Sequence, residues 1–154
     1  MPSNLPPDTR LLLIDDHQIY LDGLSLTLGS LCEGVKLDHA HNAAQAIQQV
    51  QSNTYDLILL DLQLPDSSGL ALLRRLNAID AMVPVAILTA SNSPSDLDAA
   101  LQLGAAGFIS KTADGKTLIE AVTQLLFGAQ VVIGDESRPL DRQSSARDVG
   151  ITPR

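Results

Sequence analysis

The residues best suited to chemistry follow short apolar runs of the chain. Two adjacent carboxylates, Asp15 and Asp16, come directly after LLLI (residues 11–14), and a third, Asp61, follows LILL (residues 57–60). Two carboxylates about 4 to 5 Å apart repel each other by roughly 3 to 4 kcal/mol at an effective dielectric of about 20. A lysine or a hard divalent cation such as Mg²⁺ would compensate this repulsion. The three acids therefore offer a candidate cation site and a candidate nucleophile.

Two further polar residues follow apolar runs in the same way. Thr89 comes after VAIL and Lys111 comes after GFIS. A hydroxyl, an ammonium and carboxylates are together the groups that phosphoryl transfer to a carboxylate requires. Each residue alone also has a plainer interpretation. An Asp after a strand is often only the N-cap of a helix, and a lone Thr or Lys usually belongs to the ordinary surface. A Mg²⁺ site with no further role is a third interpretation.

The elements that must position these side chains alternate between strands and helices. The apolar runs lie at residues 11–14, 57–60, 85–88 and 107–109, and residues 35–40 alternate as an edge strand does. Stripes of helical spacing separate them, the first formed by Tyr20, Leu24, Leu28 and Leu31, and Ser93 with Pro94 indicates a helix start.

This alternation predicts an α/β fold. Right-handed crossovers place helices on both faces of a parallel sheet. We therefore expect a flavodoxin-like, doubly wound, five-stranded parallel sheet in the order 2-1-3-4-5 with five helices, and with the second and last strands at its edges.

The expected topology brings the polar strand ends together. In such a fold, ligands bind at the carboxyl ends of the strands, near the point where strand order reverses. Strands one and three are neighbours in this order, so Asp15, Asp16 and Asp61 should meet in one crevice. Four of the five expected strands end in a polar residue of useful type, whereas the edge strand ends at Ala40. His17 is expected to begin the first helix and to take no part in the chemistry.

Length, charge and composition limit the remaining possibilities. The 154 residues allow one domain with tails, for which we expect a disordered tail over 1–9, a domain over 10–128 and a polar linker over 129–150. A formal net charge of -8 disfavours binding of nucleic acid by this chain alone. A single cysteine, no long apolar segment and no secretory signal indicate a cytoplasmic protein without a membrane segment. Phosphate-loop motifs of the GxxxxGK[ST] or GxGxxG type are absent from the sequence.

Taken together, the motifs resemble the receiver domain of two-component response regulators over roughly residues 10–128. The matching segments are IDDH, LLDLQLPDSSG (59–69), the LTA that ends strand four and GAAGFISK (104–111). DDHQIYLDGLSLTL and the final ITPR are similar to NarL/LuxR-type regulators, in which an LTPR-like segment opens a helix-turn-helix DNA-binding domain. The resemblance implies that residues 151–154 begin such an effector domain, which this fragment of a longer transcription factor lacks.

The resemblance also implies a role for each site residue. Asp61 would accept a phosphoryl group from a phosphohistidine on a partner sensor histidine kinase. Asp16 and Asp61 would bind Mg²⁺ directly, Asp15 would act through water, and Gln63 would contribute its backbone carbonyl. Lys111 would contact the carboxylate and then the phosphoryl oxygens.

A conformational switch is implied as well. Thr89 would move to hydrogen-bond to the phosphoryl group, and Phe108 would turn inward to fill the vacated space. Phe108 is Phe where Tyr is commonest, so no phenol hydroxyl can carry the signal. The face of helix four, strand five and helix five would then mediate homodimerisation or effector docking, and DNA would be reached only through the effector domain. Such a domain is no turnover enzyme and catalyses only its own phosphorylation and slow autodephosphorylation.

Two other classes of function stay open. A phosphatase with an Asp nucleophile would usually carry a second acid two residues later, where this sequence has Gln63. Steady turnover of external phosphate esters would favour this class. A phosphorylation-independent interaction module could keep the fold, but the complete set of acceptor residues argues against it.

Overall fold

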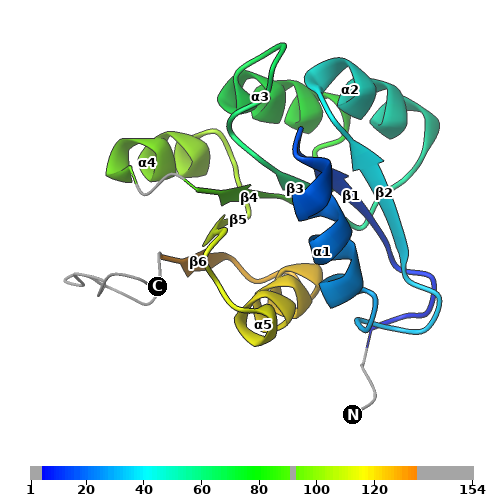
Figure 1. Ribbon diagram of the computed structural model, residues 1–154. Helices are drawn as coiled ribbons and strands as arrows, with labels where there is room; N and C mark the ends of the chain where they lie inside the picture. The colour runs from blue at the N-terminus through cyan, green and yellow to red at the C-terminus, as the bar shows by residue number, and fades with distance from the viewer. Residues whose placement is uncertain (1–4, 91–92, 135–154) are drawn as a thin grey trace.

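The computed structural model describes residues 5–90 and 93–134, and within them five helices alternate with six strands (Figure 1). The strands are β1 (Arg10–Ile14), β2 (Lys36–Ala40), β3 (Leu57–Leu60), β4 (Val85–Thr89), β5 (Gly107–Ser110) and β6 (Val131–Ile133). The helices are α1 (Gln18–Leu28), α2 (Ala43–Ser52), α3 (Gly69–Ile79), α4 (Pro94–Gln102) and α5 (Gly115–Leu126).

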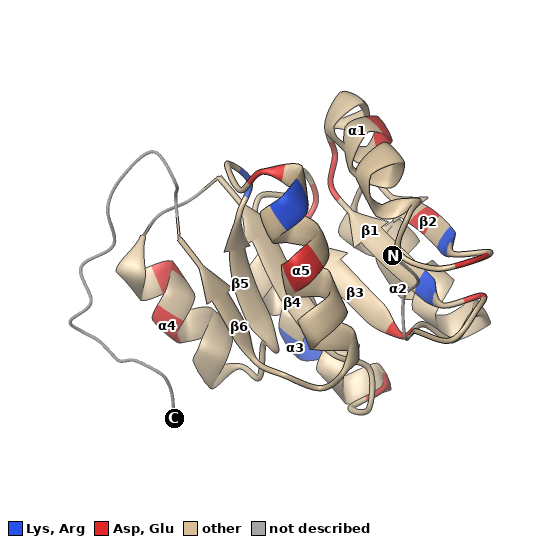
Figure 2. Ribbon diagram, turned by 90° about the horizontal axis from the view of Figure 1, so that it is seen from below, with Lys and Arg blue, Asp and Glu red and all other residues tan. Residues whose placement is uncertain are grey.

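All strands lie parallel in one sheet with the order β2-β1-β3-β4-β5-β6. Alternate residues of each strand point to opposite faces, so Leu11 and Leu13 of β1 join one hydrophobic cluster whereas Leu12 and Ile14 join another. The first cluster includes the apolar residues of α1 and α5, and the second those of α2, α3 and α4. Figures 1 and 2 show the corresponding two helical layers on either side of the sheet.

Four of the helices begin at side-chain caps. Asn42, Ser68, Ser93 and Asp114 each accept a hydrogen bond from the backbone N–H three residues later. The predicted start of α4 at Ser93, with proline in the first helical position, is confirmed. The N-cap of α1 is His17, so neither of the two preceding acids serves as a helix cap. Their side chains therefore have another use.

The predicted order of the first five strands is confirmed, but the sheet is larger than expected. β6 pairs with β5, so β5 is fully buried and the prediction that it forms an edge is wrong. Val131 packs into the cluster beneath α5, and Gly107 opposite leaves room for it, since a Cβ there would lie 2.8 Å from the Val131 carbonyl oxygen. Because β6 has only three residues and is flanked by polar ones, the apolar pattern of the sequence did not predict it.

The chain ends also differ from expectation within the described residues. The expected tail over 1–9 includes Leu5, which is buried against the α1–α5 cluster, and Thr9, whose carbonyl accepts a hydrogen bond from Lys36 N–H. The expected linker over 129–150 includes β6 at its start. The rest of that segment and residues 151–154, expected to open an effector domain, lie outside the described residues. Among the described helices, none has the length and apolar character needed to cross a membrane.

Candidate functional site

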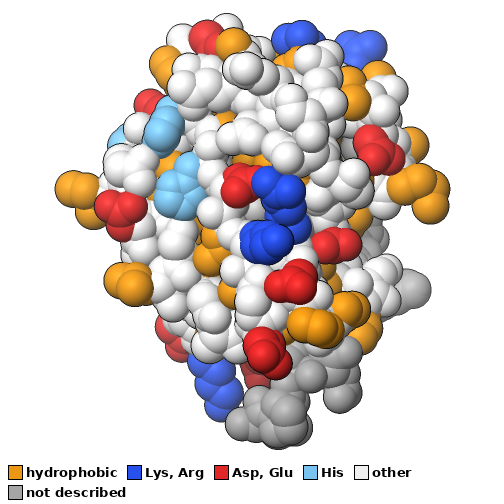
Figure 3. Space-filling view, turned by 90° about the vertical axis from the view of Figure 1, so that its right-hand side faces the viewer, with side chains coloured by type: hydrophobic (Ala, Val, Ile, Leu, Met, Phe, Trp, Pro, Cys, Tyr) orange, Lys and Arg blue, Asp and Glu red, His pale blue; other side chains and the backbone are white. Residues whose placement is uncertain are grey.

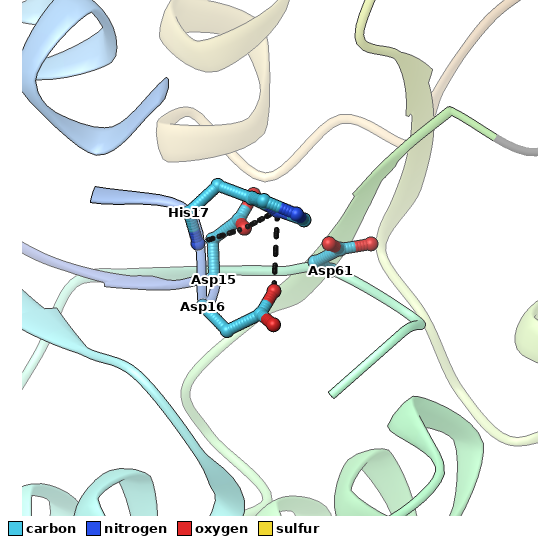
Figure 4. Close-up of side chains that lie close together, drawn as sticks. All are labelled: Asp15, Asp16, His17 and Asp61. Carbon is cyan, nitrogen blue, oxygen red and sulfur yellow. Dashed lines mark hydrogen bonds and ion pairs between the residues drawn. The ribbon is translucent and has the colours of Figure 1, made fainter. Parts of the chain in front are cut away.

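The carboxyl ends of β1 and β3 bring the three predicted acids together. Register pairs Ile14 with Leu60, and the Asp61 N–H donates to the Ile14 carbonyl at 2.9 Å. Each of Asp15, Asp16 and Asp61 has a carboxylate oxygen within 4.8 Å of those of the others (Figure 4). The crevice predicted from strand order is therefore present, and it lies where the strand order reverses.

Lys111 reaches these acids from the end of β5. Its backbone N–H donates to the Thr89 carbonyl at 2.9 Å, which continues the β4–β5 pairing past the last residue of the strand. Its ammonium Nζ lies 2.5 Å from Asp15 Oδ2 and 3.1 Å from Asp61 Oδ2. The side chain is only 15% exposed, so both ion pairs are largely shielded from water. The structure thus supplies the cation that the adjacent acids require.

Burial and neighbouring charges shift the pKa values of Asp61 and Lys111. Asp61 is 4% exposed, and burial raises its pKa above the ordinary value; the Gln63 N–H at 3.2 Å and Lys111 act against this shift, and Asp15 adds to it. Burial alone would lower the pKa of Lys111, but hydrogen bonding and attraction from Asp15 and Asp61 outweigh it and raise that pKa. Asp61 is consequently an anion that burial and Asp15 disfavour and that Lys111 stabilises.

His17 belongs to the cluster, contrary to expectation. Its ring Nδ1 lies 2.9 Å from Asp15 Oδ1 and 3.1 Å from Asp16 Oδ1, and its backbone N–H also donates to Asp15 Oδ1 at 2.9 Å (Figure 4). The signal in the sequence was the spacing, since a polar residue two positions after an Asp can donate its N–H to that carboxylate. Both oxygens of Asp15 are therefore engaged, whereas among the described residues the Asp16 carboxylate pairs only with the exposed imidazole.

The donor set is compatible with a hard divalent cation. Three carboxylates converge, and Mg²⁺ prefers such oxygen ligands together with water and phosphate. Asp16 is the most exposed of the three acids at 35%, whereas Asp15 and Asp61 are 3% and 4% exposed and each is bonded through both oxygens. The residues present thus fit the expected ion.

The remaining predicted residues lie in the adjoining strands. Thr89 ends β4, is 1% exposed and stands in register with Ser110 of β5. Phe108 is 6% exposed and lies between Ile87 and Val132 in the register of the sheet, on the face covered by α4. The ring occupies an inward position in this structure, and its predicted movement stays a prediction.

Tyr20 also belongs to the site, although the sequence assigned it only to the apolar stripe of the first helix. Lys111 Nζ lies 4.5 Å from the centroid of its ring. Burial, followed by the nearby charges of Asp15 and Asp61, raises the pKa of the phenol to about 12. The ring is therefore neutral at physiological pH. The sequence carried no signal for this contact, because it joins residues more than ninety positions apart.

One face of the molecule carries charges of both signs. Figure 3 shows acidic and basic side chains side by side, with histidines next to them, on one face of the molecule. The net charge of -8 is therefore not concentrated on this face. The three clustered acids are compensated locally by Lys111.

A doubly wound parallel sheet with acids after β1 and β3 and a lysine after β5 defines a receiver-type signalling domain. The comparison with known families agrees. Residues 11–123 match the response regulator receiver domain, and the chain belongs to this family. It is thus a receiver domain of a two-component response regulator.

Individual relatives place the chain near the NarL and LuxR groups. It is 31% identical over 160 aligned positions to the nitrate/nitrite response regulator protein NarL of Escherichia coli K12, covering 99% of this chain and 73% of NarL. It is 35% identical to the transcriptional activator protein ExaE of Pseudomonas putida, covering 77% of this chain and 55% of ExaE. A LuxR family DNA-binding response regulator from Silicibacter pomeroyi superimposes with a TM-score of 0.71 at 32% identity, covering 84% of this chain and 99% of that one.

Proposed function

We propose that Asp61 accepts a phosphoryl group from a phosphohistidine on a partner sensor histidine kinase. The observation that carries this assignment is the buried Asp61 carboxylate, which lies 3.1 Å from the Lys111 ammonium and within reach of two further acids. A buried, poorly solvated carboxylate is a better nucleophile than one in water. The neighbouring Lys111 ammonium can also stabilise the negative charge of the transferred phosphoryl group.

The transfer is an in-line displacement. A carboxylate oxygen of Asp61 attacks phosphorus, the P–N bond to the donor imidazole breaks, and its electron pair stays on the imidazole nitrogen, which then takes up a proton. Lys111 holds the carboxylate before attack and the phosphoryl oxygens afterwards, while the Gln63 N–H fixes Asp61 Oδ1. Asp15, Asp16, Asp61 and the Gln63 carbonyl would hold Mg²⁺. When bound, Mg²⁺ neutralises the acids and orients the phosphoryl oxygens.

The phosphorylated state would then bias the surface beyond the site. Thr89 and Phe108 stand at the end and in the middle of neighbouring strands, between Asp61 and the α4–β5–α5 face. We infer that their movement alters this face and favours a homodimer. Since NarL and ExaE are named as regulators of nitrate response and transcription, the output proposed for this chain is control of transcription through a DNA-binding effector domain.

Acid-stable, base-labile phosphorylation tests the acceptor. The wild type and the Asp61→Asn and Asp38→Asn variants are incubated with Mg²⁺ and acetyl phosphate, and their intact masses are measured. Asp38 is a matched control, since it is a half-buried Asp of β2 that pairs with Arg10 and not with Lys111. We expect one added phosphoryl group on the wild type and on Asp38→Asn, and none on Asp61→Asn or with EDTA. The proposal fails if the wild type gains no phosphoryl group from either acetyl phosphate or the kinase.

A phosphatase that turns over external esters is the competing class. Its leaving group would need a proton from the residue two positions after the nucleophile, and the amide of Gln63 cannot supply one. Incubation with a chromogenic phosphate monoester should therefore give no steady release of alcohol. Sustained turnover that Asp61→Asn abolishes would favour the enzyme instead.

A further inference from the structure

The ammonium of Lys111 has a third partner besides the two carboxylates. Asp15 and Asp61 lie on one side of it, and the face of the Tyr20 ring lies 4.5 Å away. A cation within about 6 Å of the centroid of an aromatic ring is attracted by the negative charge on its face. The lysine head is thus enclosed by two anions and one neutral ring.

Tyr20 is held in place independently of the acids. It is the third residue of α1, and the neighbouring Leu21 and Leu24 are 0% and 5% exposed in the core cluster beneath the helix. Tyr20 itself packs against that cluster. Its ring is therefore positioned by the packing of α1 on the sheet and does not depend on the charge state of the acids.

A lysine at this position needs such support during the reaction. Its side chain has four flexible bonds, and ordering them costs conformational entropy. The two carboxylates hold the ammonium before phosphorylation, but Asp61 loses its negative charge density to the new acyl phosphate bond. The partners that do not change during the transfer are Asp15 and the ring, and the ring is the one that holds the ammonium without a charge of its own.

We propose that Tyr20 is a positioning residue for phosphoryl transfer, which keeps the Lys111 ammonium next to Asp61 through the face of its aromatic ring. This role rests on the proposed function of Asp61 as phosphoacceptor. It requires the ring and not the hydroxyl. Phenylalanine should therefore replace Tyr20 well, whereas an aliphatic side chain of similar bulk should not.

Four variants separate this role from a merely structural one. Tyr20→Phe keeps the ring, and Tyr20→Leu keeps apolar bulk without it. Ile19→Ala changes the adjacent residue of α1, whose side chain is 88% exposed. Leu28→Val loosens α1 at its far end, where the buried leucine does not touch the site. Thermal unfolding is measured for each variant, so that all rates are compared at temperatures where every protein is folded.

The first readout is the rate of phosphorylation over a series of acetyl phosphate concentrations with Mg²⁺. We expect the maximal rate of Tyr20→Leu to fall roughly three- to tenfold, as loss of a partly buried cation–π contact implies. The half-saturating concentration of acetyl phosphate should change little, because Tyr20 acts on the reaction through its contact with Lys111. Tyr20→Phe, Ile19→Ala and Leu28→Val should stay within about twofold of the wild type.

The second readout is the NMR signal of the Lys111 ε-methylene protons, which the ring current shifts upfield when they lie over an aromatic face. The chain has three lysines, at positions 36, 111 and 116, so selective labelling resolves this signal. The upfield shift should be present in the wild type and Tyr20→Phe and absent in Tyr20→Leu. It should persist when Mg²⁺ and beryllofluoride, a mimic of the phosphoryl group, are added.

The outcomes separate the two proposals. A wild type that gains no phosphoryl group contradicts the acceptor role of Asp61, while the NMR shift still reports whether Tyr20 holds Lys111. A Tyr20→Leu variant that is phosphorylated as fast as the wild type overturns the positioning role. So does a Tyr20→Phe or Leu28→Val variant that loses as much as Tyr20→Leu, or a wild type whose Lys111 signal is not shifted from those of the other lysines.

Discussion

The Asp61→Asn variant should be more stable than the wild type when divalent cations are absent. Asp61 lies within 4.8 Å of two other carboxylates, and each repulsion at that separation amounts to roughly 3.5 kcal/mol at an effective dielectric of about 20. Its attraction to Lys111 at 3.1 Å amounts to about 5 kcal/mol on the same scale. Asp16 is 35% exposed, so water screens its share of the repulsion, and the two effects nearly cancel.

Burial then decides whether Asp61→Asn raises or lowers the free energy of unfolding. A carboxylate that is 4% exposed loses hydration on folding, and this loss is the largest cause of the raised pKa of Asp61. An asparagine at this position removes the repulsion and most of the desolvation, and its Oδ1 can still accept the Gln63 N–H. Lys111 keeps its pair with Asp15 at 2.5 Å. We expect Asp61→Asn to raise the free energy of unfolding by about 1 to 2 kcal/mol, which corresponds to a Tm increase of roughly 3 to 8 °C.

Mg²⁺ and pH should each reduce this difference. Mg²⁺ at about ten times its Kd stabilises the wild type by roughly 1.4 kcal/mol, and the variant less because it lacks a ligand. In the folded state the pKa of Asp61 is raised above its ordinary value of 3.8. Between pH 3.8 and this raised pKa, the folded state therefore binds more protons than the unfolded state. The wild type therefore loses stability relative to the variant as pH rises through this window, and the two should converge below pH 3.8, where Asp61 is protonated in both states.

Urea unfolding at pH 7 in EDTA, repeated with Mg²⁺ and at lower pH, measures these differences. Asp38→Asn serves as a control of opposite sign, because Asp38 accepts hydrogen bonds from Arg10 at 2.8 Å and from the Tyr55 hydroxyl at 2.7 Å. Its loss should cost about 1 kcal/mol. An Asp61→Asn variant that is less stable than the wild type in EDTA would refute the conclusion that Asp61 is electrostatically unfavourable in the folded state.

Three further substitutions test the framework that holds the site. Gly69→Ala should lower the free energy of unfolding by roughly 2 to 3 kcal/mol in urea, since its Cβ would lie 2.4 Å from a backbone atom of Leu62 in the loop after Asp61. Gly107→Ala should speed hydrogen exchange of the β6 amides, because its Cβ would lie 2.8 Å from the Val131 carbonyl oxygen. Asp114→Ala should reduce stability at neutral pH. Because a backbone N–H bond lowers the pKa of Asp114, this loss should shrink as pH falls below 3.8, and a loss independent of pH would contradict the role of its charge.

The fold could be predicted largely from where the apolar runs stop. Uninterrupted runs such as LILL indicate interior strands and the alternating residues 35–40 indicate an edge, and in the structure β3 lies inside the sheet and β2 at its edge. β6 could not be predicted in this way. Only one of its three residues is well buried, and its pairing depends on the missing side chain of Gly107, which a reading of local hydrophobicity does not register.

The site was predictable to the extent that it depends on strand ends. Asp15, Asp61 and Lys111 each follow a strand directly, so the sheet alone places them at one edge. The contacts of His17 and Tyr20 depend instead on how α1 enters and crosses the sheet. His17 has an extended backbone with φ -100° and ψ 99°, which returns its ring over the acids, and no periodicity in the sequence encodes that turn.

The unequal exposure of Asp15 and Asp16 explains why two adjacent aspartates can have different roles. Asp15 is buried, and its oxygens are committed to Lys111 on one side and to His17 on the other. Asp16 is 35% exposed, and its carboxylate pairs with the His17 ring, which is itself 66% exposed. Displacing His17 from Asp16 therefore requires no change in the core, whereas displacing Lys111 from Asp15 would take the ammonium away from a buried carboxylate. This asymmetry supports the proposed division of roles, with Asp16 as the direct ligand of a cation that reaches the site from solvent and Asp15 as the residue that keeps Lys111 in place.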